Sequence, residues 1–134
     1  MRKVVFDTNV WVSGLLWKGA PRTLIELALQ GRVRVGISPW MLQELEDVLC
    51  RSKFGLGELA AHRFVREVED LCELVVPDVV EAVVRKDPDD DQILACALSF
   101  DAELVATGDS HLLELRGHLG VRCLDPATAL ARLA

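Results

Sequence analysis

The sequence predicts a three-layer α/β domain with a mostly parallel sheet. Short apolar runs that end in polar or turn residues alternate with longer segments in which apolar residues recur every three or four positions. Strands that alternate with helices form parallel sheets covered by helices on both faces, and such strands are almost continuously apolar. At 134 residues and 51% hydrophobic content, the chain is expected to form one domain, residues 1–134.

Residues 4–37 contain two expected strands and two expected helices. Residues 4–6 are apolar and end at a polar turn, as a buried strand does. Apolar residues at helical spacing follow over 10–16, and after the interruption at 19–21 the helical spacing resumes over 23–29. The alternating valines and isoleucine of 33–37 predict the second strand.

The next helix has the clearest start in the chain. Ser38 is a good N-cap residue, and Pro39 suits the first helical position, so a helix is expected over 39–49. A second helix is expected over 59–72, where large apolar residues repeat at helical spacing. The apolar run 74–76, which precedes a proline, predicts the third strand.

The remainder of the chain continues the alternation. Residues 79–84 are apolar without a clear period, and their conformation stays open. The other expected elements are a helix over 88–98, a strand over 103–107, a helix over 110–115, a strand over 121–124 and a last helix capped by Asp125 ahead of Pro126. The chain thus has five expected strands.

The helix expected from residue 88 begins with an unusual concentration of carboxylates. Asp87 can cap the helix, and the positive end of the helix dipole favours acidic residues there. Placing successive residues 100° apart puts Asp90 at the centre of the apolar face, with Asp89 and Asp91 on its flanks and nearer water. A solvated acidic cap is the ordinary explanation, but an inward carboxylate among others is costly unless a cation or protons accompany it.

Three further carboxylates are expected near this helix start. Asp7 ends the first strand, and Asp109 follows the fourth, so both lie with Asp90 at the carboxyl edge of the sheet, where α/β proteins place their sites. Glu44 lies at the margin of the apolar face of helix 39–49, close to the same edge. A long side chain that merely lies along apolar surface would also explain Glu44.

Four converging carboxylates suit a hard cation, Mg²⁺ or Mn²⁺, which binds phosphate oxygens and activates water. Phosphodiester hydrolysis is the reaction expected of such a site. The three histidines have no close pairing and the four cysteines no ligand spacing, which argues against zinc. The sequence also contains no glycine-rich phosphate loop and no nucleophile elbow that would indicate other chemistry.

Composition and charge only partly restrict the kinds of molecule that the protein is expected to bind. The net charge of −6 argues against binding nucleic acid through charge alone, although a bound divalent ion would offset part of it. The early carboxylate at Asp7 argues against a signal peptide, and no apolar run is long enough for a membrane span, so a cytoplasmic protein is expected. Candidates for contacts with a nucleic-acid substrate are the basic residues Lys18, Arg22, Arg51, Lys53, Arg85 and Lys86 and the tryptophans Trp11, Trp17 and Trp40.

Four segments of the chain, taken in order, resemble the signature of PIN domains, particularly the VapC-like toxin ribonucleases. They are Asp7-Thr8-Asn9-Val10, Ser38 to Glu44, Asp90 with the following Ile93 to Ala97, and Thr107-Gly108-Asp109. The resemblance covers nearly the whole chain. It implies an α/β/α PIN sandwich with a five-stranded parallel sheet and a metal-dependent endoribonuclease, the toxin of a toxin–antitoxin pair, with RNA as substrate, a cognate antitoxin protein as partner and a homodimer as assembly.

The resemblance also assigns the site. Asp7, Glu44, Asp90 and Asp109 would be the acidic quartet that binds the metal and carries catalysis, and Asn9 and Thr107 match polar positions that orient the carboxylates by hydrogen bonds. Asp91 is counted with these orienting residues and is the alternative to Asp90 as the ligand. Helix geometry and the spacing to Ile93 and Ala97 favour Asp90.

Two other functions compete. Asp7 could be the nucleophile of a haloacid-dehalogenase-like phosphotransferase, but that family has a second Asp two residues later, where this chain has Asn9. The chain could also be a PIN-like binding module that has lost catalysis, and the presence of all four carboxylates argues against this.

Overall fold

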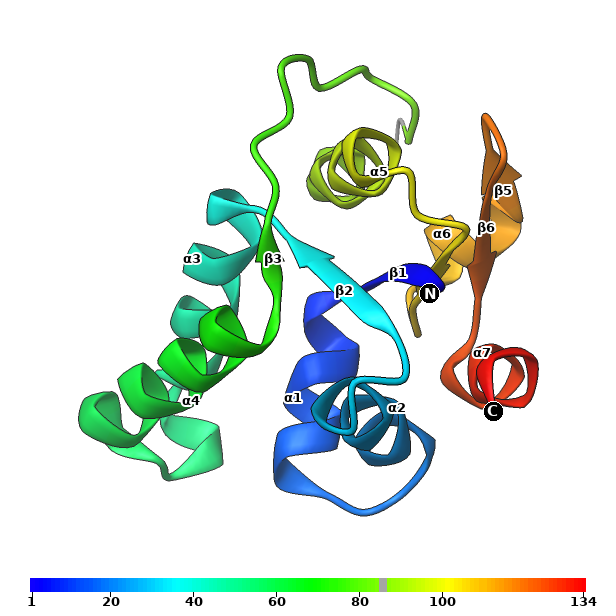
Figure 1. Ribbon diagram of the computed structural model, residues 1–134. Helices are drawn as coiled ribbons and strands as arrows, with labels where there is room; N and C mark the ends of the chain where they lie inside the picture. Colours follow the sequence, from blue (N-terminus) through cyan, green and yellow to red (C-terminus); the bar gives the residue numbers. More distant parts are fainter. Residues whose placement is uncertain (85–86) are drawn as a thin grey trace.

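The computed structural model describes residues 1–84 and 87–134 (Figure 1). Its elements, in chain order, are β1 (Lys3–Phe6), α1 (Thr8–Leu16), α2 (Ala20–Leu29), β2 (Arg34–Ile37), α3 (Pro39–Leu49), the 3₁₀ turn η1 (Ser52–Phe54), α4 (Gly57–Leu71), β3 (Glu73–Leu74), α5 (Pro88–Phe100), β4 (Leu104–Ala106), α6 (Ser110–Leu115), β5 (Gly117–His118), β6 (Val121–Leu124) and α7 (Pro126–Leu133).

The strands form one mostly parallel sheet in the order β3-β2-β1-β4-β6-β5. Every pairing is parallel except that of β5 with β6, which is antiparallel. The predicted α/β fold class is therefore confirmed. The predicted number of five strands is wrong by one, because the sheet gains β5, a two-residue edge strand next to the turn at Gly120.

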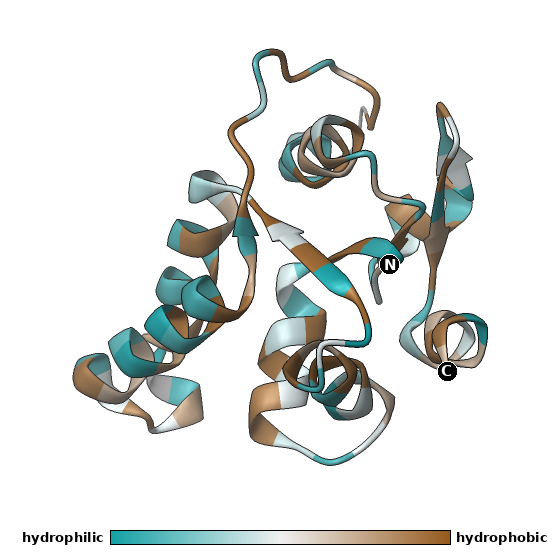
Figure 2. Ribbon diagram, viewed as in Figure 1, coloured by the Kyte–Doolittle hydropathy of each residue, from teal (hydrophilic) through white to brown (hydrophobic). Residues whose placement is uncertain are grey.

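Helices cover both faces of this sheet. Figure 1 shows α5 on one face, where it contacts β1, β2 and β4, and α1 and α2 on the opposite side, with α7 beside α2. The helices α3 and α4 pack together next to α1, at the β3 end of the sheet. Figure 2 shows β1 mostly in hydrophobic colours, and Val4, Val5 and Phe6 are fully buried. None of the helices in the described ranges is long and apolar enough to cross a membrane.

The C-terminal end of α5 packs directly on the backbone of β2. At Gly36 an added Cβ would lie 2.6 Å from Cδ2 of Phe100, a distance that real Cβ atoms do not adopt. Glycine is the residue that permits such a close approach of side chain to backbone. The ring of Phe100 therefore lies against the strand and fixes the depth of this end of the helix.

The order of the strands reverses at β1: β2 and β3 lie on one side of it, and β4, β6 and β5 lie on the other. β1 lies between β2 and β4, and the chain reaches these two neighbours through helices on opposite sides of the sheet. In open α/β sheets a crevice forms outside the carboxyl ends of strands at such a point. The residues that follow β1 and β4 therefore meet there, and the backbone N–H of Asp7 donates to the carbonyl of Ala106 at 2.9 Å.

Candidate functional site

The crevice at the ends of β1 and β4 is a cleft of about 410 Å³. Carboxylates from separate parts of the chain line one end of it: Asp7 after β1, Glu44 on α3, Asp87, Asp89 and Asp90 at the start of α5, and Asp109 after β4. The structure thus brings together all four carboxylates of the predicted quartet. The site roles of these residues remain predictions.

Asp7 is held by more hydrogen bonds than the other carboxylates of the cleft. Its Oδ1 accepts from the backbone N–H of Thr8 at 2.6 Å, as the N-cap of α1, and its Oδ2 accepts from the hydroxyl of Thr107 at 2.7 Å. The amide of Asn9 lies 3.4 Å from the same Oδ2. Burial raises the pKa of Asp7, as do the charges of Asp109 and Asp87, while the two threonine contacts oppose the shift.

Thr107 and Asn9 connect the two sides of the cleft. The Thr107 hydroxyl, which donates to Asp7, accepts from the backbone N–H of Asp109 at 3.0 Å. The side-chain oxygen of Asn9 accepts from the backbone N–H of Gly108 at 3.2 Å. These contacts join the end of β1 to the turn after β4, which is the arrangement expected of residues that orient carboxylates.

Glu44 reaches the cleft from the second turn of α3. The helix begins as predicted, with Ser38 accepting from the backbone N–H of Met41 at 3.2 Å and Pro39 in the first turn. Met41 and Leu45 are buried, which leaves the half-buried Glu44 at the edge of the apolar face. Desolvation, followed by the charges of Asp7 and Asp89, raises the pKa of Glu44 to about 7.

Within the acidic triple, Asp90 is the member buried in the cleft. Only 4% of its surface is exposed, and its Oδ2 has no hydrogen-bond partner among the described residues. Desolvation, then the charges of Asp109, Asp87 and Asp7, raises its pKa to about 8. Asp89 is exposed at the mouth of the same cleft, as its flanking position predicts.

The prediction that Asp91 stays nearer water is wrong. Asp91 is buried on an adjacent face of α5, where its Oδ1 accepts from the backbone N–H groups of Val83 and Val84 at 2.9 and 2.7 Å. Residues 75–84 form no helix or strand, and this carboxylate anchors the end of that segment to the helix. Asp91 is absent from the lining of the acidic cleft.

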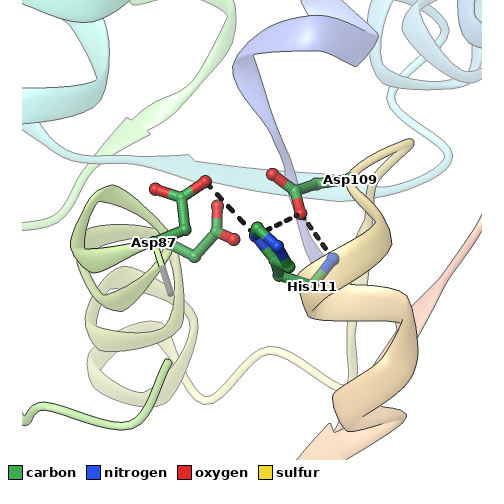
Figure 3. A group of neighbouring side chains, drawn as sticks. Asp87, Asp109 and His111 are labelled. Atoms are coloured by element: carbon green, nitrogen blue, oxygen red, sulfur yellow. Dashed lines mark hydrogen bonds and ion pairs between the residues drawn. The ribbon is translucent and has the colours of Figure 1, made fainter. Parts of the chain in front are cut away.

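Two residues that the sequence did not single out as site residues extend the cluster. Figure 3 shows the carboxylates of Asp87 and Asp109 near the ring of His111, whose Nδ1 lies 3.8 Å from an oxygen of each. One candidate ligand atom from each of Asp87, Asp90, Asp109 and His111 can be chosen so that all lie within 4.8 Å of one another. Asp87 caps α5 as expected, accepting from the backbone N–H of Asp89 at 3.2 Å. Because the sequence already explained Asp87 as a helix cap, it was not predicted to belong to the carboxylate cluster.

The donor set fits a hard divalent cation. Several carboxylates share one partly buried space, the pKa values of three of them are raised by burial and by one another, and buried oxygens of Asp90 and Glu44 lack partners among the described residues. A cation would neutralise the mutual repulsion and occupy the unpaired oxygens. His111 adds one nitrogen donor, which Mn²⁺ accepts more readily than Mg²⁺ does.

The other end of the cleft is aromatic and basic, lined by Trp17, Arg51, Lys53 and Phe54. Among the other predicted RNA contacts, Arg22 instead donates to the carbonyls of Gly14 and Leu15 at the end of α1, and Lys18 is exposed outside the cleft lining. Trp11 is buried against Phe6, and Trp40 is half-buried on a neighbouring hollow. Arg85 and Lys86 lie outside the described residues.

A comparison with known protein families finds a match over most of the chain. The PIN domain family model matches residues 3–111, from β1 into α6, a segment that contains every carboxylate lining the cleft. No curated protein matches the chain significantly.

Proposed function

Because the chain belongs to the PIN domain family, whose members are generally nucleases that use divalent metals, we propose that it is an Mg²⁺- or Mn²⁺-dependent endoribonuclease that hydrolyses single-stranded RNA. The observation that carries this proposal is the convergence of Asp7, Glu44, Asp90 and Asp109 on one cleft. The family assignment leaves the haloacid-dehalogenase-like interpretation without support.

The four carboxylates would hold the metal, with Asp87 and His111 at the side of Asp90 and Asp109. When bound, such an ion polarises the phosphodiester and activates water for hydrolysis. Thr107 and Asn9 would keep the Asp7 carboxylate in place through the hydrogen bonds described above.

Hydrolysis adds water across a P–O bond, so the attacking water loses a proton and the leaving oxygen gains one. Glu44 is suited to accept the first proton through the carboxylate oxygen that does not bind the ion, because its half-buried side chain lines the cleft. The leaving oxygen then takes its proton from solvent or from the protonated Glu44.

The cellular role proposed is that of a toxin controlled by a cognate antitoxin protein, as the resemblance to VapC-like ribonucleases implies. We also propose a homodimer, because α4 leaves Leu59 71% exposed and Phe64 and Val65 only partly buried. The cytoplasm is the proposed compartment, and the four cysteines are all free thiols, as is usual there.

The test is cleavage of a mixed-sequence single-stranded RNA by the purified protein with Mg²⁺, with Mn²⁺ and with EDTA, beside DNA of the same sequence. We expect cleavage of RNA with either metal, none with EDTA, and restoration when the metal is added back. Asp90→Asn should abolish this cleavage. Asp89→Asn is its matched control, because it removes one nearby charge at an exposed position and should cost less activity. Cleavage that persists in EDTA would overturn the metal-dependent mechanism, and preference for DNA would overturn the substrate.

A further inference from the structure

The cleft extends well beyond the carboxylates, along two helices. On α1 it is lined by Asn9 and Ser13 and, just past the helix end, by Trp17, which are four residues apart and therefore share one face. On α3 the corresponding line is Glu44, Val48 and, beyond the helix end, Arg51. The two helices contact each other and line one continuous channel, the part of the cleft that runs along them, with Asp7 at the N-terminal end of α1 and Glu44 in the second turn of α3.

An exposed aromatic pair stands at the far end of this channel. Trp17 is 57% exposed, although the other two tryptophans are buried or half-buried. Its ring centroid lies 6.5 Å from that of Phe54, with the planes tilted by 59°. Large aromatic surface left open inside a cleft indicates a ligand with a flat apolar face.

The charge around this pair is opposite to that of the rest of the cleft. Arg51 and Lys53 line the aromatic end, and the Lys53 ammonium lies 5.1 Å from the centroid of the Phe54 ring. The protein as a whole carries a net charge of −6, so the basic residues at the aromatic end differ in sign from the overall charge of the protein. Flat rings beside cations match a nucleotide, which presents a stacking base and an anionic phosphate together.

We propose that Trp17 and Phe54 form a subsite that stacks an unpaired base of the RNA strand, while Arg51 and Lys53 contact its flanking phosphates. The proposal rests on the proposed function, because it places the base on the same strand whose phosphodiester lies at the carboxylates. It also gives the reason for single-strand specificity, since a base inside a duplex has no free face for the aromatic side chains.

The length of α1 sets the separation between the two ends of the channel. Nine residues at about 1.5 Å each span ~14 Å from the Asp7 end of the helix to Trp17. A stacked strand rises about 3.4 Å per nucleotide, so the base on Trp17 lies up to roughly four nucleotides from the scissile phosphate. Strands too short to reach both ends should lose the contribution of this subsite.

Binding of a short fluorescently labelled single-stranded RNA, measured with Mg²⁺ in an Asp7→Asn background, tests the subsite without cleavage. Adding Trp17→Ala should weaken binding about 5- to 150-fold, the range for loss of one base–aromatic stack. Adding Trp17→Phe should retain most of the affinity, because it keeps a stacking ring. Tryptophan fluorescence should be quenched by RNA when Trp17 is present, and this quenching should be lost with Trp17→Phe.

The charged partners are tested by salt dependence. Lys53→Ala should reduce the slope of log affinity against log salt by about 0.7, the value for one phosphate contact on a single strand. Arg66→Ala removes an equal charge from an exposed position on α4 and should leave the slope unchanged. Circular dichroism should give the same folded signal for every variant that is compared.

The outcomes separate this inference from the proposed function. If the wild type cleaves RNA but Trp17→Ala and Trp17→Phe bind it as tightly as the background does, the subsite is refuted and the nuclease stands. If no cleavage is found but RNA binding depends on Trp17, the subsite stands without the nuclease. Equal Trp17 dependence for the strand and its duplex would also refute the subsite, as would a protein partner that needs Trp17 while RNA binding does not.

Discussion

Separate replacement of Asp90 and Asp91 should have opposite effects on stability in the absence of metal. Asp90 is a buried cleft carboxylate with an oxygen unpaired among the described residues, whereas Asp91 accepts two backbone hydrogen bonds on an adjacent face of α5. Asp90→Asn should stabilise the metal-free protein and abolish metal binding. Asp91→Ala should destabilise the protein and leave the metal ligands in place.

The magnitude for Asp90 follows from its pKa, which rises from an ordinary 3.8 to about 8 on folding. A raised pKa means that folding is favoured when the group is protonated, so this contribution is complete below about pH 4 and is lost as the pH rises through about 8. The full shift corresponds to roughly 6 kcal/mol, and solvent screening in an open cleft reduces it to about 1–3 kcal/mol. Asp90→Asn removes this penalty, so its advantage should be small at acidic pH and largest above pH 8.

The magnitude for Asp91 follows from its two contacts with Val83 and Val84. Hydrogen bonds to charged groups are worth about 1.5–3 kcal/mol each, so Asp91→Ala should lower the free energy of unfolding by about 3 kcal/mol or more. For a chain of this size that corresponds to a fall in Tm of roughly 10 °C. Asp91→Asn retains an acceptor oxygen and should lose less.

The assay is thermal unfolding across this pH range with and without Mn²⁺, combined with calorimetric titration of the metal. Mn²⁺ should raise the Tm of the wild type and of Asp91→Asn, and it should not raise that of Asp90→Asn. Asp89→Asn is the control, because its side chain is exposed and its effect on stability should stay within about 0.5 kcal/mol. If Asp91→Asn abolishes Mn²⁺ binding while Asp90→Asn retains it, the register inferred for the start of α5 is wrong.

Three other substitutions test the remaining parts of the proposal. Asp7→Asn should abolish RNA cleavage and leave or raise the metal-free Tm, because it removes one of several like charges; retained activity would exclude Asp7 from the site. Thr107→Val removes the hydroxyl between Asp7 and the Asp109 amide, so Mn²⁺ affinity measured by calorimetry should fall about tenfold to hundredfold, and an unchanged affinity would contradict the orienting role. Light scattering should show a dimer that Leu59→Glu converts to a monomer, and a monomeric wild type would refute the dimer.

The type and order of most elements could be predicted because the sequence carries local signals for them. Ser38 with Pro39 marks the start of α3, and the apolar run before Asp7 marks β1. β5 was missed because two residues, Gly117 and His118, are too few to show any period, and their pairing depends on the hairpin with β6. The third strand was expected over 74–76, but β3 is Glu73–Leu74, although Val75 still donates to the Ile37 carbonyl at 2.8 Å.

The candidate site was predictable where a residue follows a strand or lies on a helix face. Asp7, Asp90 and Asp109 were placed in this way, and Glu44 followed from its position on the same helix face as Met41 and Val48. The environment of Asp91 could not be predicted, because its hydrogen-bond partners belong to a segment without regular structure. Helix periodicity predicts the direction of a side chain, but it does not predict which other segment packs against that side chain. His111 joins Asp87 only through the tertiary fold, and no local pattern connects them.

The contact between Gly36 and Phe100 holds one end of α5 against the sheet, and the other end of this helix carries carboxylates of the cleft. The helix spans about 20 Å over its thirteen residues, with Phe100 seated on the strand at one end and Asp90 in the cleft at the other. A Cβ at Gly36 would clash with the Phe100 ring, so the ring or this end of α5 would have to move away from the strand. The position of α5, the helix that carries Asp90, thus depends on the absence of a side chain on another element, at a residue with no chemistry of its own.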